Sequence, residues 1–543
     1  MINQIFLISC WCFFSVSCIN ESAYLESPSF IVSVILPIYN TEKYLSQTFH
    51  SLETQTIGFL QNIQVIIIND GSTDNSQYHC KTFQQQYPGN VIYIQQSNMG
   101  VSAARNVGLD YVKGKYVVFF DSDDLWSSNA FEDIYSFFEK HYLDVDVVAA
   151  RIKMFDAYEG YQEIDYKFSE TKLINLQKDY KYIQMAVHST FIKASAIKKT
   201  DRFSVNLKYG EDTAFINTIL LKKCMLGVVR EAEYYHRKRK DKSSALNKEA
   251  QSPSYLFDSP IYYHQALFNR SINMYGIVLR FIQYTVMYEI KWRLPRSVTF
   301  LSDGDYRRYC TLIITSLQAI DDDIILEQTG TPLQLKLFTL SKKHGRDIRE
   351  QLYIENGTIL YQSIPLLRIA DSNTLLRCQS IQISRNTLNL KCVDTNILSH
   401  WQYRYALVSD IRMISSVVSE NTAETIPSMF GKVDISRQIL FHIKLNRYSS
   451  IKLHPIILLS AGSDKSQLSL TLGISHDLPR LTKVFGNHKI VFNSEGIIIT
   501  PSNYHGYQLI KYGAIFALIY HVGKLCLEKG IKQHLHIKKS ILP

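Results

Sequence analysis

The sequence is poor in several features that define other classes of protein. Its nine cysteines show no paired metal-binding spacing and no disulfide framework, which is typical of a reducing compartment. Charged residues make up only 20% of the chain and hydrophobic residues 46%, which excludes a disordered protein. No base-reading module is found, so we expect no nucleic acid partner. The formal charge of +10 indicates another anionic partner: nucleotide phosphates, an anionic polymer or an acidic membrane surface.

Residues 1–29 form an apolar extension that lacks the basic leading region of a signal peptide. Residues 5–19 resemble a signal-peptide core, but no Lys or Arg precedes Lys43. The stretch is also short for a bilayer span, which needs about 20 residues. A secretory signal, a weak membrane anchor and a dispensable extension are the alternatives, and the sequence favours the last two.

The most informative stretch is an apolar run that stops in a cluster of carboxylates. Residues 117–120 are all apolar and predict a strand of a mostly parallel sheet that is buried on both faces. Asp121, Ser122, Asp123 and Asp124 follow directly. Crowded carboxylates repel one another, and Mg²⁺ or Mn²⁺, which also binds substrate phosphates, would remove that cost. We therefore expect a nucleoside diphosphate here, outside the carboxyl ends of the strands. An acidic surface turn is the alternative.

The segments before this stretch alternate between strand and helix patterns. Residues 31–36, 65–68 and 91–94 are apolar, β-branched runs, each followed by turn residues and a helix start. This alternation predicts an α/β fold with a doubly wound sheet.

Four motifs in this region together resemble family 2 glycosyltransferases. They are residues 34–40, Asn69-Asp70-Gly71-Ser72, residues 98–106 and Asp121-Ser122-Asp123-Asp124, and the resemblance covers roughly residues 31–247. It implies a GT-A fold with a mixed, Rossmann-like sheet. It also implies inverting transfer of a sugar from a nucleoside diphosphate donor, a UDP-sugar, with Mn²⁺ or Mg²⁺.

The resemblance assigns roles to the residues of these motifs. It places Pro37 and Tyr39 at the nucleobase and has Asp70 accept from the uracil imide, although Asp70 as a helix cap or turn residue is the alternative. It places Arg105 near the diphosphate or against the carboxylates, with a surface helix cation as the alternative. The remaining motif residues predicted to bind the donor or the metal are Asn40, Asn98, Asp121 and Ser122, with Asp123 as the metal ligand and Asp121 as a second one.

An inverting transfer also needs a carboxylate that takes the proton of the acceptor hydroxyl. Glu211 and Asp212 open a predicted helix at the interval that the family shows, so Asp212 is the predicted base and Glu211 orients it or the acceptor. A pair of acidic helix-capping residues is the alternative. The basic run 234–244 resembles the mobile segment that closes over the diphosphate. Within it we expect Arg239 and Ser243 at the donor and His236 as a further metal ligand. A solvated charged face is the alternative.

The second half of the chain shows other patterns. We predict a GT-A domain over residues 30–250, a helical module over 251–351, an antiparallel β-sandwich over 352–505 and a C-terminal helix and tail over 506–543. The helical module packs on the transferase and shapes the acceptor site or a homodimer. The C-terminal helix either lies on a membrane surface or docks on the sandwich.

This layout weakly resembles large Gram-positive cell-surface polymer enzymes. The leading hypothesis is transfer of a sugar to a teichoic-acid-like polyol phosphate or capsular glycan, in the cytoplasm at the inner face of the cell membrane, where sugar nucleotides are available. A catalytically silent glycan-binding scaffold is the alternative from another class. Glycerol phosphate transfer by the second half is disfavoured, because that half shows no nucleotide-binding motif.

Overall fold

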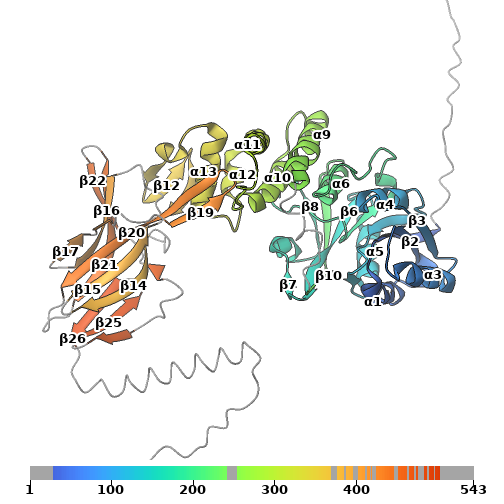
Figure 1. Cartoon of the computed structure of the whole chain (residues 1–543), viewed down its shortest axis with the longest axis horizontal. Helices are drawn as coiled ribbons and strands as arrows, with labels where there is room; N and C mark the ends of the chain where they lie inside the picture. Colours follow the sequence, from blue (N-terminus) through green and yellow to red (C-terminus); the bar gives the residue numbers. More distant parts are fainter. Residues whose placement is uncertain are drawn as a thin grey trace, which may run out of the picture. The chain divides into compact units, whose positions relative to one another are not determined.

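A computed structural model describes residues 29–240 and 253–368 and, between residues 376 and 501, the strands given below and the turn at residues 429–430. The chain forms two compact units, Met1–Thr285 and Val286–Pro543, and the division falls inside helix α10 (Arg280–Arg293). The two units are described separately (Figure 1).

The first unit is built on a ten-stranded mixed sheet. Three parallel pairs, β3–β2, β2–β1 and β1–β4, form one half. Short β9 then runs antiparallel between β4 and β6, and β10 continues parallel to β6. The order is β3 (Val91–Gln96), β2 (Ile63–Asp70), β1 (Phe30–Ile38), β4 (Gly114–Phe119), β9 (Thr190–Lys193), β6 (Val147–Asp156), β10 (Met225–Lys238) and β5 (Leu125–Trp126), while β7 (Gly160–Tyr161) pairs with β6 and β8 (Lys172–Asn175) with β10.

Helices cover both faces of this sheet, as the apolar strands require (Figure 1). Alternate residues of β1 face opposite ways: Val34 belongs to one core, and Ile35 lies under α4 on the other face. Gly108 allows this approach, because a Cβ there would lie 2.5 Å from Ile35 Cγ2. The helices are α1 (Glu42–Glu53), α2 (Phe59–Asn62), α3 (Ser76–Gln86), α4 (Val101–Leu109), α5 (Ala130–Lys140), α6 (Glu211–Leu220), α8 (Pro253–Asp258), α9 (Gln265–Tyr275) and α10, with the 3₁₀ segments η1 (Glu163–Phe168) and η2 (Ala194–Ala196) and the π-helix η3 (Ser259–His264).

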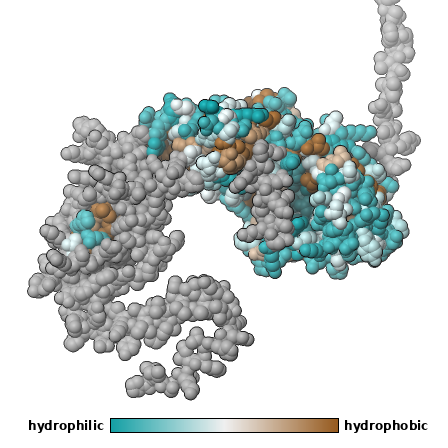
Figure 2. Space-filling model, in the orientation of Figure 1, coloured by the Kyte–Doolittle hydropathy of each residue, from teal (hydrophilic) through white to brown (hydrophobic). Residues whose placement is uncertain are grey.

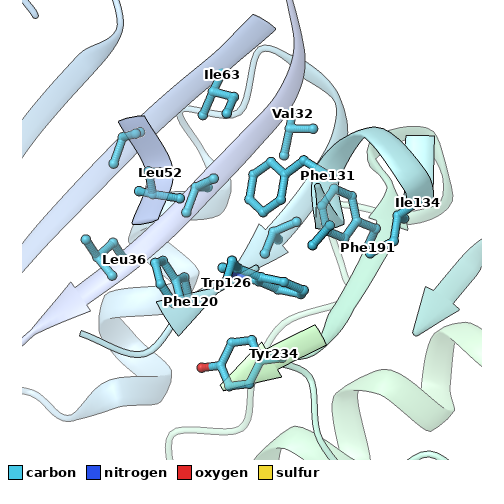
Figure 3. Packing of buried hydrophobic residues seen from close by; sticks show 14 of the residues in the cluster. Val32, Leu36, Leu52, Ile63, Phe120, Trp126, Phe131, Ile134, Phe191 and Tyr234 are labelled. Carbon is cyan, nitrogen blue, oxygen red and sulfur yellow. The ribbon is translucent and has the colours of Figure 1, made fainter. Parts of the chain in front are cut away.

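An aromatic cluster ties the two halves of the sheet together (Figure 3). The Trp126 ring lies edge-on to Tyr234 at 4.8 Å and to Phe131 at 5.5 Å, and Phe131 meets Phe191 of β9 at 4.9 Å. Each such pair stabilises by about 0.5–1.5 kcal/mol beyond burial. The visible face of this unit is mostly hydrophilic, in keeping with an apolar interior (Figure 2).

The second unit contains helices followed by separate, almost wholly antiparallel sheets. Its helices are α11 (Asp303–Gln318), α12 (Asp322–Leu326), α13 (Leu333–His344) and the turn η4 (Ile348–Gln351). A small sheet has the order β11 (Tyr353–Glu355), β12 (Thr358–Tyr361), β13 (Ile364–Arg368). The second sheet has the order β18 (Val417–Val418), β20 (Gly431–Lys444), β15 (Thr387–Asp394), β14 (Leu376–Ser384), β23 (Gly473–Ile474), with β19 (Glu424–Ser428) on β20. The third has β17 (Arg412–Ser415), β16 (Gln402–Ser409), β21 (Ile451–Ala461), β26 (Gly496–Pro501), β25 (His488–Asn493), β24 (Thr482–Phe485), with β22 (Asp464–Ser469) on β21.

The predicted fold class is confirmed: a mixed α/β sheet domain, then helices, then antiparallel sheets. One local expectation needs refinement, because the strand before the carboxylates is parallel to β1 but antiparallel to β9. Residues 1–28 and the helix predicted within 506–543 lie outside the described residues, and the four domain boundaries stay predictions. In the part of the chain that the structure describes, no helix has the length and apolarity to span a bilayer.

Candidate active site

The predicted site residues lie at one edge of the sheet because three neighbouring strands are parallel. β1 ends at Ile38, β2 at Asp70 and β4 at Phe119, and Ile38 is paired with Asn69 while Ile35 is paired with Phe119. Their carboxyl ends therefore meet at one edge, which is where open α/β sheets bind ligands.

Each carboxylate that follows β4 has its own partner in the protein. Asp121 Oδ1 lies 3.1 Å from the Arg105 guanidinium, and Asp123 Oδ2 lies 2.6 Å from Arg239. Asp124 is 1% exposed and accepts from the Tyr234 hydroxyl at 2.7 Å and the Arg237 amide at 2.7 Å. Asp124 therefore anchors strand β10 to the motif.

Arg105 is the centre of the site. Its side chain is 4% exposed and reaches three carboxylates: Asp121 at 3.1 Å, Glu211 at 3.3 Å and Asp212 at 2.5 Å. The guanidinium also lies over the Phe203 ring at 5.3 Å. The structure thus places Arg105 against the carboxylates, the second of the two positions that the family resemblance allowed.

Glu211 and Asp212 stand in the first turn of α6, where the positive end of the helix dipole favours a carboxylate. Burial raises the pKa of Asp212, but the Arg105 guanidinium and His188 lower it by more, so the carboxyl stays ionised. Burial and the charge of Asp212 raise the pKa of Glu211, and the more distant guanidinium only partly opposes this. Two neighbouring carboxyls with opposite shifts are the arrangement in which one holds the charge and the other the proton.

His188 is a site residue that sequence reasoning missed. Its Nδ1 lies 3.6 Å from Asp121 Oδ2 and 3.7 Å from Asp212 Oδ2. Burial lowers the pKa of this imidazole, but the surrounding carboxylates, Asp212 first, raise it by more. His188 stands alone before a four-residue strand and belongs to no motif. Only knowledge of which segments the fold brings together could have identified it.

Asn40 and Asp70, two residues predicted to bind the donor, belong to a network of turns. Asn40 has a positive φ of 53° and its Oδ1 accepts from the Thr73 amide at 2.8 Å. Asp70 accepts from the Gln96 side chain at 2.7 Å and from the amides of Met99 and Gly100 at 2.8 Å. Asp70 therefore braces the turn before α4, which is the capping alternative, and its contact with a uracil stays a prediction.

The remaining predicted donor residues lie on or next to these turns. Pro37 is within β1, Tyr39 follows it with 51% exposure, and the buried Ser122 offers its carbonyl to Thr48 Oγ1 at 3.0 Å. Asn98 packs against Gly71, where an added Cβ would lie 2.8 Å from the Asn98 nitrogen. Ser243 lies outside the described residues.

The predicted basic loop needs correction. Residues 234–238 are the end of strand β10, paired with β6, and only Arg239 and Lys240 of the described residues follow it. Tyr234 is buried, the residues after it up to Lys238 are half-buried, and Asp124 binds this strand, which explains why the charged sequence is a strand here.

The residues present fit a divalent cation held partly by substrate. Burial and the charges of Asp124 and Asp121 raise the pKa of Asp123 in spite of Arg239, so its ionised form is disfavoured and a cation beside it would stabilise that form. His236 turns Nδ1 to Asp124 at 3.1 Å, the carboxylate contact that a metal-binding imidazole usually makes with its other nitrogen. Within the described ranges no three His, Cys, Asp or Glu side chains group to hold a metal. A cation here would complete its coordination with phosphate oxygens and water, as Mg²⁺ commonly does.

Comparison with known proteins identifies the family. The model of glycosyl transferase family 2 matches residues 33–200. The minor teichoic acid biosynthesis protein GgaA of Bacillus subtilis is 35% identical over 62% of this chain and 78% of its own length. The chain belongs to glycosyltransferase family 2. The predicted resemblance is thereby confirmed.

Two other likenesses extend over more of the chain. The minor teichoic acid biosynthesis protein GgaB of Bacillus subtilis is 30% identical over 95% of this chain, and this chain covers 58% of the GgaB length. The crystal structure of S. aureus TarS matches 88% of this chain and 86% of its own at 15% identity with a TM-score of 0.49. At that score the likeness to TarS carries no inference about function.

Proposed function

We propose that the chain is a metal-dependent inverting glycosyltransferase that moves a sugar from a UDP-sugar to a teichoic-acid-like polyol phosphate or another cell-surface glycan. The observation that carries this proposal is the convergence of Asp121 and Asp212, from two distant segments, on the single guanidinium of Arg105. This convergence supports the proposal that the residues after β4 bind the donor and that Asp212 abstracts the proton.

The acceptor part of the proposal has two supports. GgaA and GgaB both carry minor teichoic acid biosynthesis in their names. The formal charge of +10 on this chain suits an anionic polymer. We expect the reaction on the cytoplasmic side of the membrane, because sugar nucleotides are made there.

The chemistry assigns one step to Asp212. Its ionised carboxylate takes the proton of the acceptor hydroxyl while that oxygen bonds to the anomeric carbon of the sugar. The bond from this carbon to the diphosphate oxygen breaks on the opposite face, which inverts the configuration. Glu211, with a raised pKa, keeps its proton and adds no second negative charge beside the base.

The donor side is held by the residues that follow β4. Asp123 would hold a divalent cation, with His236 as the second protein ligand. When bound, that cation neutralises charge on the departing diphosphate. Arg239 brings a guanidinium to the same carboxylate, and a guanidinium suits paired phosphate oxygens.

The test is a donor screen with the full chain. UDP-, GDP-, CDP- and dTDP-sugars are incubated with Mn²⁺ or Mg²⁺ and a poly(polyol phosphate), and products are measured by mass spectrometry. We expect acceptor-dependent consumption of a UDP-sugar that chelation abolishes. Asp212→Asn should slow it by about 10²–10⁴-fold. Asp110→Asn is the matched control, because Asp110 pairs with Arg202 at 2.7 Å and is 62% exposed.

Two results would contradict the proposal in different ways. Equal rates for Asp212→Asn and Asp110→Asn would remove Asp212 as the base. Saturable binding of UDP-sugar without turnover, with every acceptor and metal tested, would favour the silent glycan-binding scaffold instead.

A further inference from the structure

Arg105, His188 and two carboxylates close a ring at the base of the site. Arg105 binds the Oδ1 atoms of Asp121 and Asp212 at 3.1 Å and 2.5 Å. His188 faces the Oδ2 atoms of the same two carboxylates at 3.6 Å and 3.7 Å. Each carboxylate therefore has the Arg105 guanidinium at one oxygen and the His188 imidazole, at ion-pair distance, facing the other.

The packing of His188 leaves its ring little freedom. The ring lies 4.8 Å from that of Tyr234 and is nearly parallel to that of His236, at 5.5 Å and 13°. Its Nε2 is buried and has no hydrogen-bond partner among the described residues. The polar contacts that the described structure gives this side chain are thus the two carboxylates, both through Nδ1.

The backbone supports the same arrangement. Val187, the residue before His188, directs its amide to Asp212 Oδ2 at 3.5 Å, and the Thr190 hydroxyl donates to the Val187 carbonyl at 2.7 Å. Residue 190 begins β9, which is hydrogen-bonded to β4, the strand that leads to Asp121. The segment that carries His188 is therefore anchored to the strand that carries the donor motif.

We propose that His188 is a positioning residue that orients the base Asp212 against the donor motif through Nδ1. This inference rests on the proposed function. Arg105 holds Asp212 Oδ1, and the Val187 amide and the His188 ring both face Oδ2, so His188 adds a side-chain restraint on which Asp212 lone pair faces the acceptor hydroxyl. Misplacement of a reacting group by about 1 Å can cost ~100-fold in rate, so loss of this second contact should appear in kcat.

The choice of substitution separates the two ring nitrogens. His188→Asn places an amide near the position of Nδ1 and should keep the contact with the carboxylates. His188→Gln places its amide near the position of Nε2, and His188→Ala removes both. His141→Asn is the matched control, because His141 Nδ1 also lies 3.6 Å from a carboxylate, that of Asp144, at the end of α5.

The experiment measures kcat, KM for the UDP-sugar, UDP affinity by calorimetry and the melting temperature of each full-length variant. We expect kcat to fall ~100-fold in His188→Ala and His188→Gln and about 10-fold or less in His188→Asn. KM, UDP affinity and melting temperature should change little in the Asn variant. In an Asp212→Asn background, His188→Ala should cause no further loss of kcat, since His188 acts through Asp212.

Several outcomes would overturn the inference. They are an unchanged kcat in His188→Ala, equal losses in the Asn and Gln variants, and a full further loss in the Asp212→Asn background. A fall in melting temperature that accounts for the lost activity, with no difference between Asn and Gln, would indicate a structural role only. A wild-type chain without transferase activity would instead contradict the proposed function, so the two failures are distinguishable.

Discussion

Replacing Arg105 by Met tests whether one buried guanidinium holds the active site together. The side chain is 4% exposed and contacts three carboxylates at 3.1, 3.3 and 2.5 Å. Met keeps an apolar stem against Phe203 and removes only the charge and the donors. Removing one partner of a buried ion pair typically costs about 3–5 kcal/mol, because the other charges stay buried without compensation.

The pH dependence of this loss follows from the pKa of Asp212. Burial raises that pKa, but Arg105 and His188 lower it by more. An ionised Asp212 therefore contributes stability above the ordinary carboxyl pKa of about 4, and this contribution is lost as pH falls through the lowered value. Without Arg105 the carboxyl protonates at higher pH. The difference between wild type and Arg105→Met should thus be largest near neutral pH and shrink as pH falls.

The assay is urea denaturation of the full chain at about pH 7 and about pH 5, followed by intrinsic tryptophan fluorescence, to which Trp126, buried in the same unit, contributes. The matched control is Arg202→Met, which breaks the ion pair to Asp110 at 2.7 Å with 32% and 62% of the side chains exposed. That pair should contribute about 0–1 kcal/mol. If Arg105→Met loses no more stability than Arg202→Met, or loses the same at both pH values, the account of the site as a charge-compensated ring is wrong.

Three further predictions concern other residues of the candidate active site and of the turns beside it. Burial raises the pKa of Glu211, so this residue contributes stability below the ordinary carboxyl pKa and the contribution is lost as pH rises through the raised value. Glu211→Gln should therefore flatten the decline of the melting temperature with pH. Parallel melting profiles of the variant and the wild type from about pH 6 to about pH 9 would contradict this. Gly71→Ala should weaken UDP binding and lower the free energy of unfolding by more than the ~1–2 kcal/mol of left-handed strain, because its Cβ would meet the Asn98 backbone at 2.8 Å. Gly276→Ala, with a similar φ and open space, should cost that strain alone. Equal losses of stability in the two variants by urea denaturation would refute the contact. Asp124→Asn should destabilise by about 1–3 kcal/mol, because an amide cannot accept all the bonds that tie β10 to the motif, and an unchanged unfolding midpoint would refute this anchor.

Local patterns were sufficient to predict the first half of the sheet. The apolar runs of β1, β2, β3 and β4 each stop at turn residues, and both signals come from the strand itself. β9 gave no such signal, because four buried residues without periodicity can belong to many kinds of segment. Its antiparallel insertion between β4 and β6 depends on tertiary pairing, which single-sequence patterns do not report.

The end of β10 shows how a tertiary contact overrides a charge pattern. Residues 236–240 are all basic or imidazole side chains, which on their own favour a solvated loop. In the folded chain Asp124 accepts from Tyr234 and from the Arg237 amide, so the acidic motif holds this strand in the sheet. These hydrogen bonds give Asp124 a structural role. The acidic motif alone could not show whether Asp124 has this role or binds a metal.

The division of labour between Glu211 and Asp212 is also a property of the fold and not of the motif. Both residues lie in the first turn of α6, and both are buried carboxyls close to Arg105. The guanidinium lies 0.8 Å closer to Asp212 than to Glu211, the difference between 3.3 Å and 2.5 Å, and His188 faces only Asp212 of the two among the described ion pairs. Because two adjacent buried carboxyls resist ionising together, this small asymmetry decides that Asp212 holds the charge. A general base must be ionised before the acceptor arrives, so the position of Arg105, 107 residues earlier in the sequence, favours Asp212 of the two acids as the proposed base.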